Sequence, residues 1–255
     1  MAVPQEVTIQ FGKPLWSARS KPMGADRLCC NLLLALSRQQ IEHLRDAVVH
    51  YSFPPDYFDF IANAPERLED TKAVEIRIGR GLTSGDPDRV RDGLSNVLYW
   101  GYAQMGIRDT RVQRFRQKPI VSQLDRACDL FRRSPLPSAF EIKKLGLPEF
   151  SGLSFVSKVR MFLDPEKSAT LDRQILKIHE QCPTTLLAGL HIGRSTQIPV
   201  TKRNSDVYEL WCQKMVEISR EYFSGRFRAV DVERGFFQLI QAGEVLTAAQ
   251  TLGAA

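Results

Sequence analysis

Residues 145–178 read LGLPEFSGLSFVSKVRMFLDPEKSATLDRQILKI, and the expected fold rests on this stretch. Gly146 and Pro148 predict that a helix ends here, because glycine favours the C-terminal cap and proline cannot extend the hydrogen-bond ladder. The chain then turns, and Ser154 is a candidate N-cap for a second helix over residues 155–163. The stretch therefore predicts two helices joined by a tight turn.

The second helix has an apolar face with a lysine at its edge. Lys158 falls among apolar positions that recur at helical spacing, namely Phe155, Val156, Val159, Phe162 and Leu163. Asp164-Pro165 ends this helix, and Asp172 is a candidate N-cap for the next one. On these residues alone, Lys158 is a lysine whose stem covers apolar surface, and Asp172 is a capping residue.

The arrangement as a whole resembles a known family. Helix, glycine-containing hairpin, helix with lysine, short loop and aspartate is the layout of the helix-hairpin-helix DNA glycosylase superfamily. Residues 155–158 (FVSK) resemble the lysine-bearing start of its second hairpin helix, particularly in the 8-oxoguanine glycosylase-like branch. Residues 171–175 (LDRQI) resemble its hydrophobic-Asp-x-x-Ile/Val segment. The chain departs from the pattern in that residues 152–154 (GLS) replace the Gly-hydrophobic-Gly turn, and the lysine lies closer to the aspartate in sequence.

The resemblance implies an all-α fold of two closely packed helical subdomains with the active site in the cleft between them. We expect an N-terminal arm over residues 1–27 and a single glycosylase-like domain over residues 28–255, with the hairpin motif at 140–178. The resemblance also implies that Lys158 is the nucleophile. Asp172 would be its electrostatic and proton-handling partner.

The implied reaction excises a damaged or modified base that has been flipped out of duplex DNA. Breaking an N-glycosidic bond develops positive charge on the sugar, which a nearby carboxylate stabilises. A lysine held as the free amine can attack C1′, and the resulting Schiff base allows the strand to be cleaved at the abasic sugar. Oxidised guanine is the base that the resemblance implies. Another modified base stays open, as do the roles of repair and of defence against foreign DNA.

Further site residues are expected on the same grounds. Gln39 and Gln40 lie in a Leu-Ser-x-Gln-like step, which in many of these enzymes carries the side chain that fills the gap left by the flipped base. The aromatic candidates for stacking on that base are Tyr99, Trp100 and Trp211. The hairpin backbone over residues 150–157 would hold phosphates, and the expected DNA contacts there are Gly152, Ser154, Ser157 and Arg173.

The charge balance favours a polyanionic partner. The formal net charge is +6 and the isoelectric point is about 9.1. Basic residues gather over 108–118, 126–133, 202–203 and 220–228. Clusters of this kind suit phosphate contacts, although solvated helix faces explain any one of them equally well. We expect double-stranded DNA as the partner and a monomer with no obligatory protein partner.

The sequence predicts no cofactor and no membrane. The five cysteines lack the clustered spacing of an iron–sulfur site and are expected to be reduced thiols. The four histidines show no paired spacing for zinc. No apolar run is long enough to span a bilayer and no signal peptide begins the chain, so a cytoplasmic protein is expected.

Helical patterns cover most of the remaining chain. They fall at 28–49, 88–102, 110–117, 120–133, 138–145, 172–181, after residue 204, and at 230–242. Residues 63–90 are expected to be irregular and those from 243 frayed, with Asp231 and Glu233 as capping acids. Two other classes stay open: a helix-hairpin-helix DNA-binding module without catalysis, and an interaction protein of a helical assembly.

Overall fold

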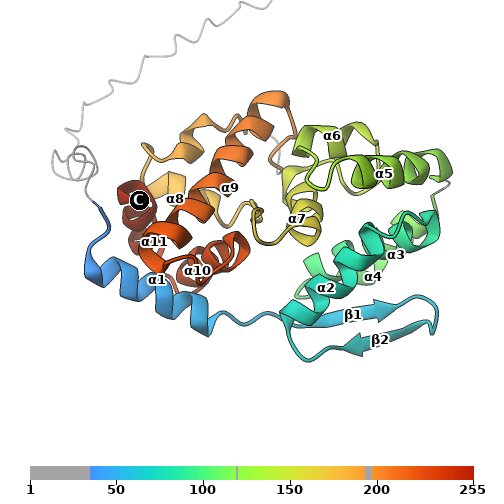
Figure 1. The fold of residues 1–255 in the computed structure, drawn as a ribbon, viewed down its shortest axis with the longest axis horizontal. Coiled ribbons are helices and arrows are strands. Elements are labelled where there is room, and N and C mark those ends of the chain that lie inside the picture. The colour runs from blue at the N-terminus through green and yellow to red at the C-terminus, as the bar shows by residue number, and fades with distance from the viewer. Residues whose placement is uncertain (1–34, 119, 193–196) are drawn as a thin grey trace, which may run out of the picture.

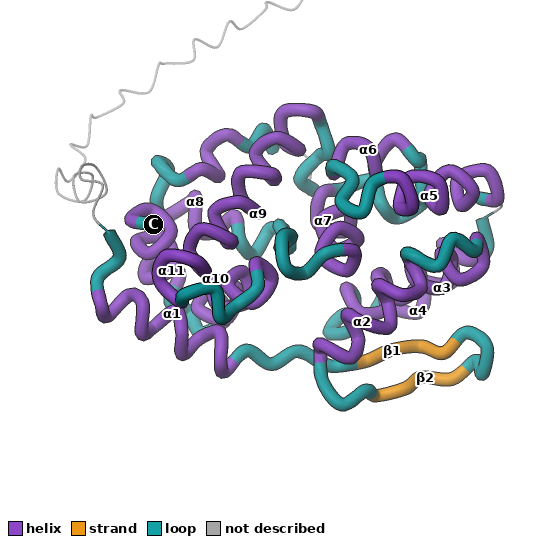
Figure 2. The backbone as a smooth tube through the Cα atoms, in the orientation of Figure 1, coloured by secondary structure: helices purple, strands orange, loops and turns teal. Residues whose placement is uncertain are grey.

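A computed structural model describes residues 35–118, 120–192 and 197–255, and over these residues the protein is mostly helical (Figures 1 and 2). The α-helices are α1 Arg38–His50, α2 Thr71–Leu82, α3 Pro87–Gly101, α4 Arg108–Arg116, α5 Val121–Arg133, α6 Ala139–Lys144, α7 Leu153–Leu163, α8 Leu176–Gln181, α9 Lys202–Phe223, α10 Ala229–Gln241 and α11 Val245–Ala254. A 3-10 turn, η1, spans Leu186–Gly189. The predicted predominance of helix is confirmed.

The helices form two groups that lie side by side (Figure 1). In the first group, α10 packs on α1, α9 and α11, and α8 packs on α11. In the second, α3 packs on α2, α4, α5 and α7. A buried ion-pair network joins the groups, because Glu75 of α2 pairs with Arg228, just before α10, and with Arg234 of α10.

A two-stranded antiparallel sheet, β1 Asp56–Asp59 and β2 Ala64–Arg67, flanks α3. The prediction that residues 63–90 are irregular is wrong here and at α2, which begins after Asp70. The Asp70 side chain accepts a hydrogen bond from the N–H of Ala73 and so caps this helix. Gly79 and Gly81 lie inside α2 and do not mark turns. The absence of a side chain at these positions allows neighbouring segments to pack closely.

The hairpin before α7 matches the predicted helix, turn and helix. Gly146 has a φ of +69° and Glu149 a φ of +67°, so the turn uses two residues in the left-handed region. The N-cap of α7 is Gly152 and not the predicted Ser154, because the helix already begins at Leu153. Gly152 also forms an isolated bridge with Pro199, which ties the hairpin to the segment before α9.

Helix α1 begins at Arg38, and residues 35–37, which the predicted helix over 28–49 includes, are not helical. Ser37 and Gln40 form a capping box, in which each side chain accepts a hydrogen bond from the other residue's backbone N–H. At the other end, α1 crosses α10 closely at Gly235, where a Cβ atom would lie 2.6 Å from Val48 Cγ2. The predicted arm and the start of the predicted helix at 28–34 lie outside the described residues.

The C-terminal residues form helix α11 and are not frayed as predicted. Ala248, Ala249 and Leu252 are buried against the rest of the first helix group. Because two of these three residues are alanines, the sequence shows no clear apolar pattern that would predict this packing. Within the described ranges, no helix combines the length and apolar character needed to cross a membrane.

Candidate active site

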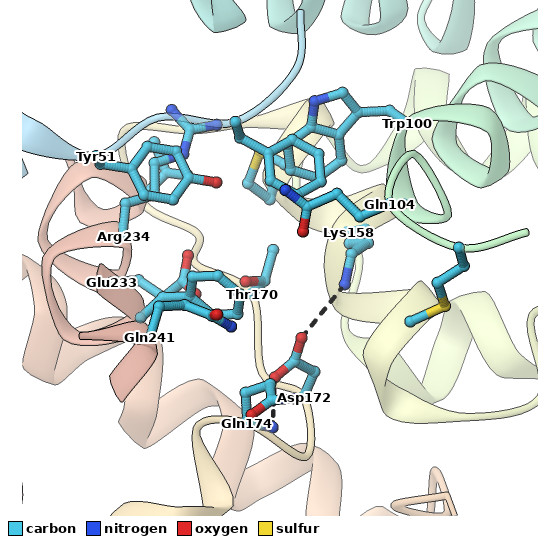
Figure 3. Close-up of a pocket in the computed structure, with 16 residues that line it drawn as sticks. Tyr51, Trp100, Gln104, Lys158, Thr170, Asp172, Gln174, Glu233, Arg234 and Gln241 are labelled. Atoms are coloured by element: carbon cyan, nitrogen blue, oxygen red, sulfur yellow. Dashed lines mark hydrogen bonds and ion pairs between the residues drawn. The ribbon is translucent and has the colours of Figure 1, made fainter. Parts of the chain in front are cut away.

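A pocket lies between the two helix groups, with walls from α3, α7, α10, the segment after α1 and the loop between α7 and α8 (Figure 3). Its volume is about 140 Å³, whereas a single water needs only ~10–15 Å³. A second pocket of about 220 Å³ adjoins it on the hairpin side. Lys158 and Asp172 line both pockets and therefore stand at the boundary between them.

Lys158 places its amine nitrogen at this boundary. Its side chain is 11% exposed, and its Nζ lies 3.8 Å from Oδ2 of Asp172. The same Nζ donates to the carbonyl oxygen of Ser154 at 3.3 Å and lies 5.4 Å from the centre of the Phe155 ring. A Cβ on Gly101 would lie 3.2 Å from Lys158 Cδ, so the absence of a side chain there leaves room for the lysine stem.

Three hydrogen bonds, two from α9 and one from α7, clamp the loop that carries Asp172. Trp211 of α9 donates from Nε1 to the carbonyl oxygen of Thr170 at 2.9 Å, and Tyr208 donates from its hydroxyl to that of Ala169 at 2.8 Å. From α7, the hydroxyl of Ser157 accepts the backbone N–H of Leu171 at 3.1 Å. These bonds fix the backbone immediately before Asp172.

The burial of two of these residues contradicts the roles that the sequence predicted for them. Trp211 has no exposed surface and does not line the pocket, so it cannot stack on a base. Ser157 is also fully buried and cannot contact DNA. Both instead position the loop that carries Asp172 through hydrogen bonds to its backbone, an arrangement that depends on which helices pack around it.

Asp172 caps a turn and does not directly cap helix α8. Its Oδ1 accepts the backbone N–H groups of Gln174 at 2.9 Å and Ile175 at 3.4 Å. The regular helix begins only at Leu176, later than predicted. With Oδ1 held by the backbone, Oδ2 is the oxygen that faces Lys158.

One face of α10 forms the wall opposite Lys158. Val230, Glu233, Arg234, Phe237 and Gln241 recur at helical spacing and all line the pocket (Figure 3). Glu233 is only 3% exposed and accepts a hydrogen bond from the Thr170 hydroxyl. Burial, together with the nearby charge of Asp172, raises the pKa of Glu233 to about 7.

The prediction that Glu233 is a capping acid is therefore wrong. The sequence places it in the first turns of a helix, where acids commonly cap, but its side chain turns inward to the pocket. Asp231 does act at this helix start, since its Oδ2 accepts the backbone N–H of Arg228 at 3.0 Å. Only the packing of α10 against the other elements distinguishes the two acids.

Aromatic rings form two sides of the pocket. Trp100 lines it as predicted and packs on Phe53 with ring centroids 4.6 Å apart. Across the pocket, Tyr51 and Phe237 meet edge to face at 6.4 Å. Phe53, Tyr51 and Phe237 were not predicted, because they come from a sequence break and from a helix far from the motif.

Tyr99 does not belong to this aromatic lining. It is 4% exposed and faces the sheet, with its ring 5.5 Å from that of Phe58 and beneath the Arg108 guanidinium at 4.0 Å. A helix turns by about 100° between neighbours, so Tyr99 and Trp100 point in different directions. The predicted stacking role of Tyr99 is wrong.

Several buried polar atoms of the pocket residues have no hydrogen-bond partner among the described residues. They are the Nε1 of Trp100, the Oε1 of Gln174 and an Nη2 of Arg234. Buried polar groups without partners cost about 1–3 kcal/mol each. Two donors and one acceptor of the lining residues thus lie buried and unpaired within the described part of the chain.

The hairpin forms the wall of the second pocket. Gly152, Ser154 and the exposed Arg173 line it together with Gln197. The N–H of Leu153 donates to Ile198, which leaves the next amides of the first turn of α7 facing this side. Three of the four predicted DNA-contacting residues of the hairpin region are therefore brought to one surface.

Gln39 and Gln40 are not brought to the pocket. Gln40 is engaged in the capping box with Ser37, and both glutamines lie at the opposite end of α1 from Tyr51. A helix of 13 residues is roughly 20 Å long, which is too far for a side chain to bridge. The turn after α3 instead places Gln104 and Met105 at the pocket, and Met105 lines both cavities.

Part of the basic cluster at 108–118 is occupied by internal ion pairs. Arg111 pairs with Glu149 at 2.9 Å, Arg108 with Asp56 at 3.1 Å and Arg116 with Asp92 at 2.6 Å. These arginines hold α4 against the hairpin, the sheet and α3. The cluster is therefore a weaker sign of nucleic-acid binding than its sequence suggests.

Comparisons with protein-family models, with curated proteins and with solved structures gave no match. Among the residues that the structure describes, no three His, Cys, Asp or Glu side chains are grouped in a way that could hold a metal ion. Cys128, Cys182 and Cys212 are buried free thiols. The candidate site is thus defined by its own geometry.

Proposed function

We propose that the protein is a DNA glycosylase of the helix-hairpin-helix type that excises a damaged or modified base and cleaves the abasic sugar through a lysine Schiff base. The observation that carries the proposal is the Lys158–Asp172 pair, 3.8 Å apart and at the boundary of an aromatic-walled pocket. An amine and a carboxylate at this separation can act on one sugar carbon.

The pocket between the helix groups would receive the flipped base. Trp100 and Phe53 would stack on one face of the base and Phe237 would contact it from the α10 side. Gln104 and Met105 are exposed at this opening and are the side chains best placed to enter the gap in the duplex. They replace Gln39 and Gln40 in that proposed role.

The hairpin side would hold the DNA backbone. Amides of the first turn of α7, the side chain of Ser154 and the guanidinium of Arg173 surround the second pocket. Helix N-termini favour anions through their N–H groups and dipole. A phosphate next to the target nucleotide would bring its C1′ towards Lys158 between the two cavities.

At C1′, Asp172 and Lys158 would have different roles. The carboxylate of Asp172 stabilises the positive charge that develops on the sugar as the base departs. The Nζ of Lys158 attacks C1′ as a free amine and then loses a proton. The nitrogen lone pair next opens the C1′–O4′ bond, O4′ takes up a proton, and the protonated Schiff base that results allows the strand to be cleaved. The hydrogen bond from Nζ to the Ser154 carbonyl aims the lysine from the start of α7.

Borohydride trapping tests the proposal directly. We expect a covalent adduct between the wild-type protein and a duplex with one abasic site, and no adduct for Lys158→Gln. Lys167→Gln is the matched control, since this exposed lysine follows α7 in the same loop. Trapping that survives Lys158→Gln contradicts the assignment of the nucleophile.

A non-catalytic DNA-binding module is the second candidate. It is favoured by one contact, the hydrogen bond from Lys158 to Ser154, which a purely structural lysine would also make. This module would bind duplex DNA with an affinity that falls steeply with salt, yet give neither adduct nor released base. The borohydride trapping assay, combined with a DNA-binding titration, distinguishes the glycosylase from the non-catalytic module.

A further inference from the structure

We propose that Glu233 is the acid that protonates the departing base, and that the substrate is therefore a neutral base that needs a proton to leave. This inference rests on the proposed function and deepens it. It assigns a third catalytic residue, on α10, and it separates neutral bases from alkylated bases that already carry a positive charge.

The first support is the position of Glu233. Its carboxyl group lies on the pocket face of α10, is 3% exposed, and has Phe237 and Gln241 on the same face. The base that enters this pocket stands between α10 and α3, whereas its sugar stays at the boundary with Lys158. Glu233 therefore faces the base, and Asp172 faces the sugar.

The second support is the charge around Glu233. Asp172 and the Thr170 hydroxyl act on it from the loop, Lys158 from α7 and Arg234 from its own helix. Arg234 is largely neutralised by Glu75 of α2 at 2.6 Å, and burial raises the pKa of Tyr51, so its hydroxyl is neutral. Desolvation outweighs the two cations and raises the pKa of Glu233 to about 7.

The third support is the contrast with Asp172. The Asp172 side chain is 23% exposed and accepts two backbone N–H groups, an environment that suits a carboxylate. Glu233 has burial and a single hydroxyl donor. Two carboxyl groups in such different surroundings can take the separate roles of a stabilising anion and a proton donor.

The proposed step balances as follows. The C1′–N bond breaks and its electron pair goes to the base, which takes the proton from the Glu233 carboxyl group. The electron pair of Lys158 Nζ forms the new bond to C1′. Glu233 is left as a carboxylate and recovers a proton from solvent once the base has left.

The substrate class follows from the need for a proton. A neutral base departs as an anion unless an acid protonates it as the bond breaks. A 7-alkylpurine already carries a positive charge and needs no proton from Glu233 to leave. An oxidised or deaminated base meets these requirements, whereas a cationic 7-alkylpurine does not.

The experiment compares base release with abasic-site trapping. Duplexes carrying 8-oxoguanine, hypoxanthine, uracil or 7-methylguanine, and one carrying an abasic site, are treated with wild-type protein and Glu233→Gln in single turnover. We expect Glu233→Gln to lower release of the neutral base by about 100-fold, a usual contribution of general acid catalysis. It should retain the borohydride adduct on abasic DNA, where no base is left to protonate.

The pH profile gives a second readout. Release by the wild type should fall as the pH rises above about 7, and this fall should be absent in Glu233→Gln. Thr170→Val removes a hydrogen bond that lowers the pKa of Glu233, so it should move the fall to higher pH. This variant tests the inference even if Glu233→Gln does not fold. Glu244→Gln, exposed just beyond α10, is the control.

Three results would overturn the inference. They are release by Glu233→Gln at the wild-type rate, an equal loss on neutral and cationic bases, and a wild-type protein that traps on abasic DNA but releases no neutral base. An absent adduct between the wild type and abasic DNA is a different failure, because it removes the proposed function itself.

Discussion

The Nζ of Lys158 lies 3.8 Å from Oδ2 of Asp172, and this contact joins helix α7 to the clamped loop that follows it. The two residues belong to one continuous segment of sequence, yet three hydrogen bonds from α7 and α9 set their separation. The geometry of the Lys158–Asp172 pair therefore depends on residues outside the pocket lining.

The first prediction concerns Asp172→Asn. This change keeps the shape of the side chain but removes the charge next to Lys158, so stabilisation of the developing cation is lost. We expect base release to fall by roughly 10²-fold or more, the usual effect of removing one electrostatic group. Single-turnover release measures it, with Asp206→Asn on the exposed face of α9 as the control. Equal rates for both variants would rule out the role of Asp172.

The second prediction uses two glycines. In Gly101→Ala the new Cβ would lie 2.6 Å from Phe155 Cε1 and 3.2 Å from Lys158 Cδ, so both side chains must move. We expect trapping to slow by about 10-fold or more, because small misplacements of a nucleophile are costly. In Gly106→Ala no atom lies within 4 Å, and a stability gain of roughly 0.4–1 kcal/mol is expected. Similar trapping rates for the two variants would contradict the packing argument.

The third prediction concerns the clamp. Trp211→Phe leaves the Thr170 carbonyl oxygen without its donor inside the core, which should cost about 1–3 kcal/mol. Thermal unfolding should show a lower Tm, and abasic-site trapping should slow as the loop loses its support. If Trp211 instead stacked on the base, base release would drop while the Tm stayed at the wild-type value.

The fourth prediction is the pH dependence of stability. The native pKa of Glu233, about 7, lies above its ordinary value of 4.5. Between these two values the native state holds a proton that the unfolded state has released, so the free energy of unfolding falls as the pH rises through this window. The loss is up to about 3 kcal/mol, complete above the native pKa.

Urea denaturation at pH 5 and pH 8 measures this effect. Glu233→Gln lacks the titrating group, so its stability relative to the wild type should improve on going from pH 5 to pH 8. Parallel curves for the two proteins would show that Glu233 titrates near its ordinary pKa in the folded state.

The fifth prediction concerns the ion-pair network between the helix groups. Glu75→Gln leaves the buried Arg234 and the largely buried Arg228 without their shared carboxylate. Breaking a buried pair from one side costs about 3–5 kcal/mol. Glu66→Gln, which removes the exposed partner of Arg77, should cost under about 1 kcal/mol. Equal costs in denaturant titrations would show that Glu75 adds nothing beyond a surface ion pair.

Local signals in the sequence determined much of the secondary structure. The capping box at Ser37, the turn at Gly146 and the apolar spacing of α7 depend on residues a few positions apart, so they were readable without the fold. The same holds for the Lys158–Asp172 pair, because both residues lie in one segment that contains a single loop.

Only the tertiary structure decided which side chains line the pocket. Trp211 and Glu233 were both assigned by residue type and position in their helices, and both assignments failed once the helices packed together. The partner of Trp211 lies 41 residues earlier in the chain, and Glu233 meets its neighbours across two elements. Burial and charge depend on such distant contacts, and helical periodicity carries no information about them.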